Sequence, residues 1–285
     1  MRWMIRSLLV IAVSLYVTQA HAAEGVEIVP DIAYGHKHGM ALTFDVYKPE
    51  QGANGAGILF IVSGGWYSNW RPPEQNMGWF KPMLDKGFTV FAVRHGSSPK
   101  YVIPEIIEDV RRSVRFVRLR AEEFGVDPER LGVAGASAGG HLSLMLGTAS
   151  DDGDPNAKDE VLRVSDRVAA VVAYYPPTDI RPWVSLDSEI SKAFPALRFE
   201  EEKAAACSPL LQVSKDDAPT LLVHGDKDSL VPLHHSERIL AEFEKHKVAS
   251  ELLVIKGAGH GFRGNNGKRA GDALVAWFGK HLTKK

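Results

Sequence analysis

One segment reads Leu131-Gly132-Val133-Ala134-Gly135-Ala136-Ser137-Ala138-Gly139-Gly140, a run of small apolar residues that leads into a G-x-S-x-G pattern. A helix-like segment, His141-Leu142-Ser143-Leu144-Met145-Leu146, follows it. Between a strand and a helix, this pattern places the serine on a sharp turn where only small neighbours fit beside the strained backbone. The Ser137 hydroxyl then stands at the start of a helix, whose N-terminus favours negative charge. The alternative is a glycine-rich turn with a surface serine, and the rest of the chain distinguishes the two.

Apolar runs and amphipathic helical patterns alternate on both sides of this turn. Continuous apolar runs, typical of strands covered on both faces, occupy residues 58–62, 88–93, 167–174, 220–223 and 252–255. Helical stripes lie between and after them, one opened by Pro104, one with Ile239, Leu240 and Phe243, and the last with Leu274, Trp277, Phe278 and Leu282. Residues 26–29 and 42–47 read as antiparallel strands around a turn at 35–39. The alternation predicts an α/β fold with a mainly parallel sheet that helices cover on both faces.

The first 22 residues have the pattern of a secretory signal peptide. A basic start at 1–6 precedes an apolar run at 7–18 that is short for a bilayer, and Ala20-His21-Ala22 supplies an A-x-A cleavage signal. We expect cleavage after Ala22, export to the periplasm or the medium, and no stable membrane association afterwards; an uncleaved anchor is the alternative. Residues 23–285 are then expected to form a single domain, with a small helical cap around 178–207.

Charge and cysteine content argue against several classes of protein. The chain has 34 basic and 35 acidic residues, a net charge of −1, and no tract of lysine and arginine, which argues against a nucleic-acid partner. Cys207 is the only cysteine, so an internal disulfide is excluded and the core must stabilise the domain. No C-x-x-C metal set occurs, and His36 and His38 lie in a glycine-bounded segment that reads as a hairpin turn. The sequence therefore predicts neither a metal nor an organic cofactor.

Chemically suggestive residues follow four of the predicted strands. They are Ser63-Gly64-Gly65, Ser137, the pair Asp226 and Asp228, and His260. Functional residues gather at the carboxyl ends of strands in open α/β sheets, so we expect these side chains to meet at one edge. Serine, acid and histidine also occur in the chain order of the α/β-hydrolase triad.

A catalytic triad assigns a role to each of these residues. A serine hydroxyl is a poor nucleophile until a base takes its proton, and His260, between two glycines, can reach Ser137 from a tight loop. The imidazole needs an acceptor that fixes its tautomer, and Asp228 is the preferred residue for that role. Asp226 is the alternative, although its place nearer the strand suits a hydrogen bond to the loop backbone. The remaining histidines of the region are expected to be structural or exposed: His141, His224, His234 and His235.

A tetrahedral intermediate also needs donors for its oxyanion. The backbone N–H of Ala138 follows the nucleophile directly, and Gly64 and Gly65 let the main chain approach the substrate closely. We expect these three residues to form the oxyanion hole, with Trp66 as a further candidate. The aromatic side chains of Trp66, Tyr67, Trp70 and Trp183 are candidates to stack on a sugar or aryl group, and packing of the loop and cap is the alternative.

The chain resembles the α/β-hydrolase esterases, in particular the hormone-sensitive-lipase-like and bacterial feruloyl- or acetyl-esterase-like groups. The resemblance covers nearly all of residues 23–285 and rests on four segments. They are the early strand at 42–49, Asp127-Pro128-Glu129-Arg130 running into the serine segment, Val223-His224-Gly225-Asp226-Lys227-Asp228 followed by Val231-Pro232, and Gly259-His260-Gly261-Phe262. In the family, the aspartate three residues before this Val-Pro is the triad acid, which favours Asp228. The family's usual His-Gly-Gly-Gly-Trp motif reads Val62-Ser63-Gly64-Gly65-Trp66 in this chain, with valine in place of the histidine and serine in place of the first glycine.

The leading hypothesis is a serine carboxylic-ester hydrolase that acts on short acyl esters or on acetyl and feruloyl esters of plant polysaccharides. A peptidase of the prolyl-oligopeptidase type shares the fold and the triad order, but the chain lacks an added amino-terminal domain that would select peptides. A catalytically silent binding protein is the third hypothesis, motivated by Val62 and Ser63 in the altered loop.

Overall fold

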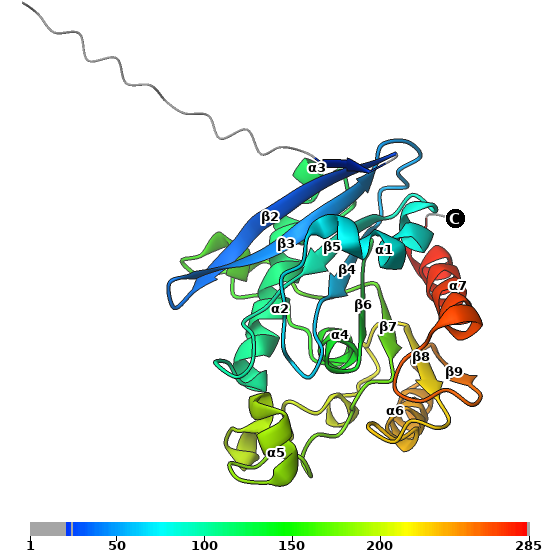
Figure 1. Ribbon diagram of the computed structural model, residues 1–285. Helices are drawn as coiled ribbons and strands as arrows, with labels where there is room; N and C mark the ends of the chain where they lie inside the picture. The colour runs from blue at the N-terminus through cyan, green and yellow to red at the C-terminus, as the bar shows by residue number, and fades with distance from the viewer. Residues whose placement is uncertain (1–20, 24, 284–285) are drawn as a thin grey trace, which may run out of the picture.

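Nine strands form one sheet in a computed structural model that describes residues 21–23 and 25–283, in the order β1-β2-β3-β5-β4-β6-β7-β8-β9 (Figure 1). Parallel pairing joins β5 (Thr89–Val93), β4 (Gly57–Ile61), β6 (Leu131–Ala136), β7 (Ala170–Tyr174), β8 (Thr220–Gly225) and β9 (Ser250–Ile255). At one edge, β1 (His21–Ala23), β2 (Val26–Lys37) and β3 (Met40–Pro49) pair antiparallel. The predicted mainly parallel sheet is confirmed.

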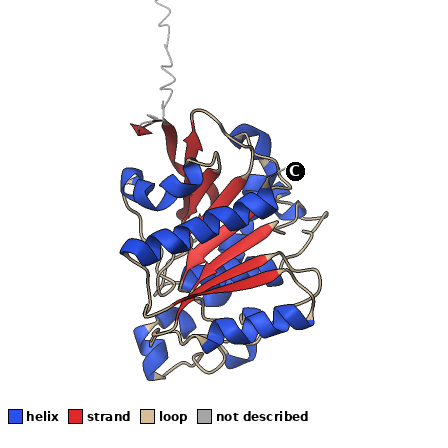
Figure 2. Ribbon diagram, turned by 90° about the vertical axis from the view of Figure 1, so that its right-hand side faces the viewer, coloured by secondary structure: helices blue, strands red, loops and turns tan. Residues whose placement is uncertain are grey.

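Helices cover both faces of the sheet (Figure 2). One face packs against α2 (Ile103–Leu119), α4 (Ala138–Thr148) and α6 (His234–Lys245), and the other against α1 (Met77–Leu84) and α7 (Gly264–Leu282). Successive residues of a strand point to opposite faces, so Ile58 of β4 joins the α1/α7 core, whereas Leu59 and Ile61 join the α2/α4/α6 core. The all-apolar strands follow from this double burial.

Short helical segments complete the chain. They are η1 (Pro73–Asn76), α3 (Ala121–Phe124), η2 (Glu160–Arg163), α5 (Glu189–Ala193), η3 (Pro195–Leu197), η4 (Glu201–Lys203) and η5 (Pro209–Leu211). The segment 178–207, for which a helical cap is expected, contains α5, η3 and η4. No helix in residues 21–23 and 25–283 combines the length and the apolar character that a membrane span requires.

The amino-terminal hairpin differs from the prediction of a turn at 35–39. Strand β2 continues to Lys37, and the turn consists of His38 and Gly39, whose φ angles are +46° and +80°. The strand carries register shifts near Val29 and Gly35, which the alternation of side chains does not reveal. Gly35 lies within the strand, and a Cβ there would meet Arg112 Nε at 2.6 Å.

The predicted signal peptide lies largely outside the described residues. The expected cleavage site after Ala22 falls within β1, whose residues pair with Val26–Ile28 of β2.

Candidate active site

Ser137 occupies the sharp turn between β6 and α4. Its φ and ψ are +55° and −119°, a strained combination for a residue with a side chain. The flanking glycines are required by close approach of the backbone: a Cβ on Gly135 would lie 2.4 Å from the Gly139 carbonyl oxygen, and one on Gly139 would lie 2.6 Å from that of Ile61. The small residues of the G-x-S-x-G pattern thus allow the strained turn that presents the hydroxyl.

The structure brings Ser137, His260 and Asp228 into one hydrogen-bonded chain. His260 Nε2 lies 2.8 Å from Ser137 Oγ, and His260 Nδ1 lies 2.7 Å from Asp228 Oδ2. A carboxylate accepts only, so the imidazole donates from Nδ1 and its Nε2 is left to accept the serine proton. This is the arrangement in which an imidazole can act as a general base toward a hydroxyl.

Two backbone amides and a second histidine hold Asp228 in place. Its Oδ1 accepts the N–H groups of Leu230 and Val231, each at 3.0 Å, and the residue is 7% exposed. His224 is fully buried behind the carboxylate, with Nε2 3.4 Å from Asp228 Oδ2 and 2.7 Å from the Val231 carbonyl oxygen. Burial lowers the pKa of His224. These contacts fix the acid so that its remaining oxygen points at His260.

Asp226, the alternative acid, lies outside this chain. Its Oδ1 accepts the N–H of Gly257 at 2.6 Å, and the residue is exposed. The bond joins the end of β8 to the loop that carries His260, which matches the structural role expected for Asp226.

The loop after β4 forms a two-residue turn. Gly64 and Tyr67 exchange both backbone hydrogen bonds at 3.0 Å, and the two residues between them, Gly65 and Trp66, have φ angles of +57° and +61°. Positive φ at both central positions is the requirement of a type I′ turn. The N–H of Gly64 therefore donates to the Tyr67 carbonyl, which corrects its prediction as an oxyanion donor.

Two of the predicted donors remain available. Within the described residues, no backbone hydrogen bond engages the N–H of Gly65, at the first central position of the turn. Ala138 is the first residue of α4, where a helix has no internal acceptor for the N–H. Gly65 lines the same cavity as Ser137, so the loop and the start of the helix can both present donors there.

The predicted aromatic residues separate into different environments. Tyr67 lines the cavity that contains Ser137 and His260, called the catalytic cavity below. The Trp66 indole is 3% exposed, packs edge-on to Phe194 and donates from Nε1 to His141 Nδ1 at 3.4 Å, which corrects the prediction of a substrate-facing ring. Trp66 has a φ of +61°, and its ring belongs to the core cluster on the α2/α4/α6 face. Trp70 is 58% exposed and does not line the cavity, and Trp183 packs against His235.

His141 supports the loop from inside α4, in agreement with its expected structural role. It is fully buried, and its Nε2 donates to the Cys207 carbonyl oxygen at 2.8 Å while Nδ1 faces Trp66. Burial lowers its pKa to about 4. The neutral ring links the loop after β4, helix α4 and the segment that ends the cap.

The buried His141 predicts acid-sensitive stability. A histidine of pKa about 4 in the fold and 6.5 when unfolded stabilises the protein above pH 6.5, and this contribution is lost as the pH falls toward 4. Between pH 7 and pH 5, the unfolding free energy of the wild type should fall by about 2 kcal/mol more than that of His141→Gln. Urea denaturation at both pH values measures this difference. His36→Gln, which changes an exposed histidine, should keep the wild-type pH dependence, and equal slopes for all three proteins would contradict the assignment.

The catalytic cavity has a volume of about 490 Å³ and includes residues that the sequence analysis missed. These are Arg71, Asn76, Arg94, Tyr175, Phe194 and Leu230. Arg94 follows β5 at the carboxyl edge of the sheet, so the strand-end rule that selected Ser137 also applies to it. Its guanidinium is held by the fully buried Asp45 at 2.6 and 2.9 Å. Phe194 comes from the cap segment, which thereby contributes to the site.

Metal ligation finds no support in the part of the chain that the structure describes. It contains no group of three or more His, Cys, Asp or Glu side chains placed to hold a metal ion. Cys207 is a buried free thiol whose pKa burial raises to about 11, which disfavours its thiolate.

Comparisons with known proteins place the chain among esterases. A family model described as BD-FAE matches residues 44–243. The chain is 28% identical to a probable carboxylic ester hydrolase, LipM, of Mycobacterium tuberculosis, over 72% of this chain and 49% of that protein. It is also 28% identical to an ethyl acetate hydrolase of Pseudomonas putida, over 85% of this chain and 78% of the relative. The chain spans about half the length of the mycobacterial esterases that it matches.

The fold recurs among solved esterase structures. An acetyl ester-xyloside bifunctional hydrolase from Caldicellulosiruptor lactoaceticus superposes with a TM-score of 0.77 at 25% identity, over 88% of this chain and 95% of that one. The α/β-hydrolase fold expected from the sequence is therefore confirmed.

Proposed function

The chain belongs to the BD-FAE family of α/β-hydrolase esterases, and from this we propose that it is a serine carboxylic-ester hydrolase. The observation that carries the proposal is the hydrogen-bonded chain from Ser137 through His260 to Asp228, at 2.8 and 2.7 Å. Ser137 is the nucleophile, His260 the general base and acid, and Asp228 the residue that fixes the imidazole tautomer.

The proposed reaction proceeds through an acyl-enzyme. Ser137 Oγ attacks the acyl carbon while its proton passes to His260 Nε2, and the N–H groups of Gly65 and Ala138 stabilise the oxyanion. The tetrahedral intermediate collapses as His260 returns the proton to the leaving alcohol. A water molecule then attacks the acyl-enzyme with His260 again as base, and the acid and free Ser137 are released.

The proposed substrates are short-chain acyl esters, with acetyl or feruloyl esters of plant polysaccharides as the natural candidates. Support comes from the relatives, which include an ethyl acetate hydrolase and an acetyl ester-xyloside bifunctional hydrolase. The cavity wall carries Asn69, Arg71 and Asn76 beside Tyr67, a mixture of polar groups and an aromatic face that suits a sugar.

An activity-based experiment tests the proposal and separates it from the alternatives. The purified protein should hydrolyse p-nitrophenyl acetate, leave aminoacyl-proline amides intact, and gain the mass of one fluorophosphonate probe on the peptide that contains Ser137. Cleavage of the amides without ester hydrolysis would instead favour a peptidase. Failure of the probe to label Ser137 would favour a catalytically silent binding protein.

We further propose that the protein is exported and that its signal peptide ends at Ala22. The basic start, the apolar run and the A-x-A pattern of residues 1–22 support this. Amino-terminal sequencing of the protein from its native host checks it, and a chain that retains residues 1–22 would contradict it.

A further inference from the structure

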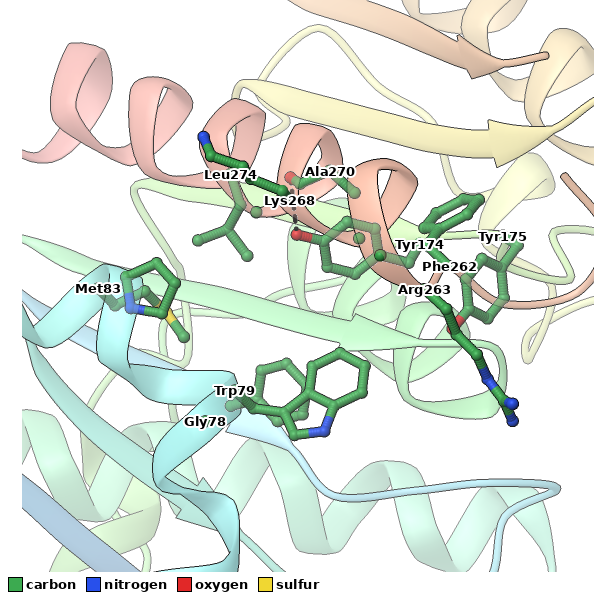
Figure 3. A pocket seen from close by; sticks show the side chains of 15 residues that line it. Gly78, Trp79, Met83, Tyr174, Tyr175, Phe262, Arg263, Lys268, Ala270 and Leu274 are labelled. Atoms are coloured by element: carbon green, nitrogen blue, oxygen red, sulfur yellow. Dashed lines mark hydrogen bonds between the residues drawn. The ribbon is translucent and has the colours of Figure 1, made fainter.

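A second cavity lies between α1 and α7, beside the catalytic cavity (Figure 3). Its volume is about 350 Å³, and its walls come from α1, α7, β4 and the end of β7. None of the triad residues lines it. The proposed ester chemistry does not use this space directly. The residues that line it therefore indicate what it could bind.

The buried part of those walls is apolar and largely aromatic. Phe60, Trp79, Tyr174, Tyr175 and Phe262 line the cavity. The Tyr174 hydroxyl is already satisfied, because it donates to the Ala270 carbonyl oxygen at 3.1 Å, drawn as the dashed line in Figure 3. A cavity of this kind favours an apolar or aromatic group.

The charged groups of the lining belong to its exposed side. Lys268 is exposed and pairs with Asp272 at 2.6 Å, one turn along α7, and Arg263 is also exposed. Neither side chain is buried among the aromatic walls, so a group inside the cavity meets no fixed charge. The cavity therefore suits an uncharged group.

The second cavity and the catalytic cavity share three lining residues, Phe60, Trp79 and Tyr175. Tyr175 directly follows β7 and packs edge-on against the His260 imidazole, with ring centroids 4.6 Å apart. It also packs against Phe262, with ring centroids 5.1 Å apart. The border between the cavities is therefore formed in part by a ring that touches the general base.

This border determines which half of an ester reaches the second cavity. The general base must return its proton to the alcohol oxygen, so the alcohol half of the ester lies on the imidazole side of the serine. We propose that the cavity between α1 and α7 binds an apolar, aryl or alkyl, alcohol group of the substrate, and that Tyr175 forms its mouth. The inference rests on the proposed ester hydrolysis and narrows its substrates: it favours short acyl esters of apolar alcohols over polysaccharide esters, whose alcohol half is a sugar.

Glycines in the lining offer a way to fill the cavity without disturbing its walls. A Cβ added at Gly78 of α1 or Gly271 of α7 would meet nothing within 4 Å. Gly279 is a matched control, because it lies on the same helix α7, has the same open surroundings and does not line the cavity. Leucine has a higher helix propensity than glycine, so Gly271→Leu and Gly279→Leu should both fold.

Two isomeric esters distinguish the two halves of the substrate. 2-Phenylethyl acetate carries its phenyl group on the alcohol, methyl 3-phenylpropanoate carries it on the acid, and methyl acetate carries none. We expect Gly271→Leu and Gly78→Leu to lower kcat/KM for 2-phenylethyl acetate by about 10- to 100-fold, the effect of losing one buried aromatic group. The same variants should leave kcat/KM for methyl acetate within about twofold of the wild type, and Gly279→Leu should match the wild type on all three esters.

Other outcomes would overturn the inference. A selective loss on methyl 3-phenylpropanoate would place the acid half in the cavity, and equal losses on all three esters would make the cavity purely structural. A wild type inactive on every ester would refute the proposed function but not the cavity. In that case the binding of 2-phenylethanol decides whether the cavity takes such alcohols. The rise in Tm that 2-phenylethanol causes is measured in Ser137→Ala and in the double variant Ser137→Ala/Gly271→Leu. An equal rise in both proteins would refute binding in this cavity.

Discussion

Replacing Ser137 with alanine should lower kcat for p-nitrophenyl acetate by about 10⁶-fold while leaving the fold intact. The proposed nucleophile is lost, so His260 can assist only the direct attack of water. The N–H groups of Gly65 and Ala138 remain, and a residual rate of about 10³- to 10⁴-fold above the uncatalysed reaction is expected from them and from binding. Steady-state kinetics on freshly purified protein measure the loss, because traces of wild-type enzyme would mask it.

Ser143→Ala supplies the matched control. Ser143 lies on the same helix α4, is fully buried, and donates from Oγ to the Gly139 carbonyl oxygen at 2.8 Å. Its loss should lower stability by about 1 kcal/mol and change kcat little. If Ser137→Ala retained more than about one hundredth of the wild-type kcat, or if both serines had the same effect, Ser137 would not be the nucleophile.

Burial on both faces explains why the central strands were predictable. The runs at 58–62, 88–93 and 220–223 read as continuous apolar stretches because α1 and α7 cover one side of the sheet and α2, α4 and α6 the other. The amino-terminal hairpin was less predictable. Its register shifts near Val29 and Gly35 change which face a residue occupies, and no local composition marks them.

The candidate site shows a similar division. The convergence of Ser137, His260 and Asp228 follows from topology, since the carboxyl ends of parallel strands meet at one edge. Backbone geometry within a loop does not follow from topology. A type I′ turn at Gly65 and Trp66 uses the Gly64 N–H and directs the indole into the core, and only coordinates reveal either fact.

The sequence also did not predict that the cap segment contributes a residue to the catalytic cavity. Phe194 belongs to the segment 178–207, which has little regular structure and no periodic pattern, yet its ring packs against Trp66 and lines the catalytic cavity. A contact between an irregular segment and a residue far away in the chain depends on tertiary packing, and the spacing of residues in the sequence does not predict it.

Asp228→Asn should lower kcat by about 10⁴-fold with little change in structure. In the wild type, Asp228 Oδ2 lies 2.7 Å from His260 Nδ1. Asparagine has nearly the same shape as aspartate, so its side chain can still face this nitrogen. An amide that donates to Nδ1 stabilises the tautomer whose proton is on Nε2. That tautomer cannot accept the proton of Ser137, so the nucleophile is present but has no base.

Asp226→Asn is the sharpest control that the chain provides, because the two aspartates are separated by one residue and competed for the same role. Asp226 accepts the Gly257 N–H at 2.6 Å, and the asparagine carbonyl oxygen can keep that bond. We expect its kcat to stay within about threefold of the wild type, since an exposed neutral substitution seldom costs more than about 0.5 kcal/mol. A large loss of kcat in Asp226→Asn together with a small loss in Asp228→Asn would contradict this assignment. The imidazole would then depend on Asp226, and Asp228 would not be the triad acid.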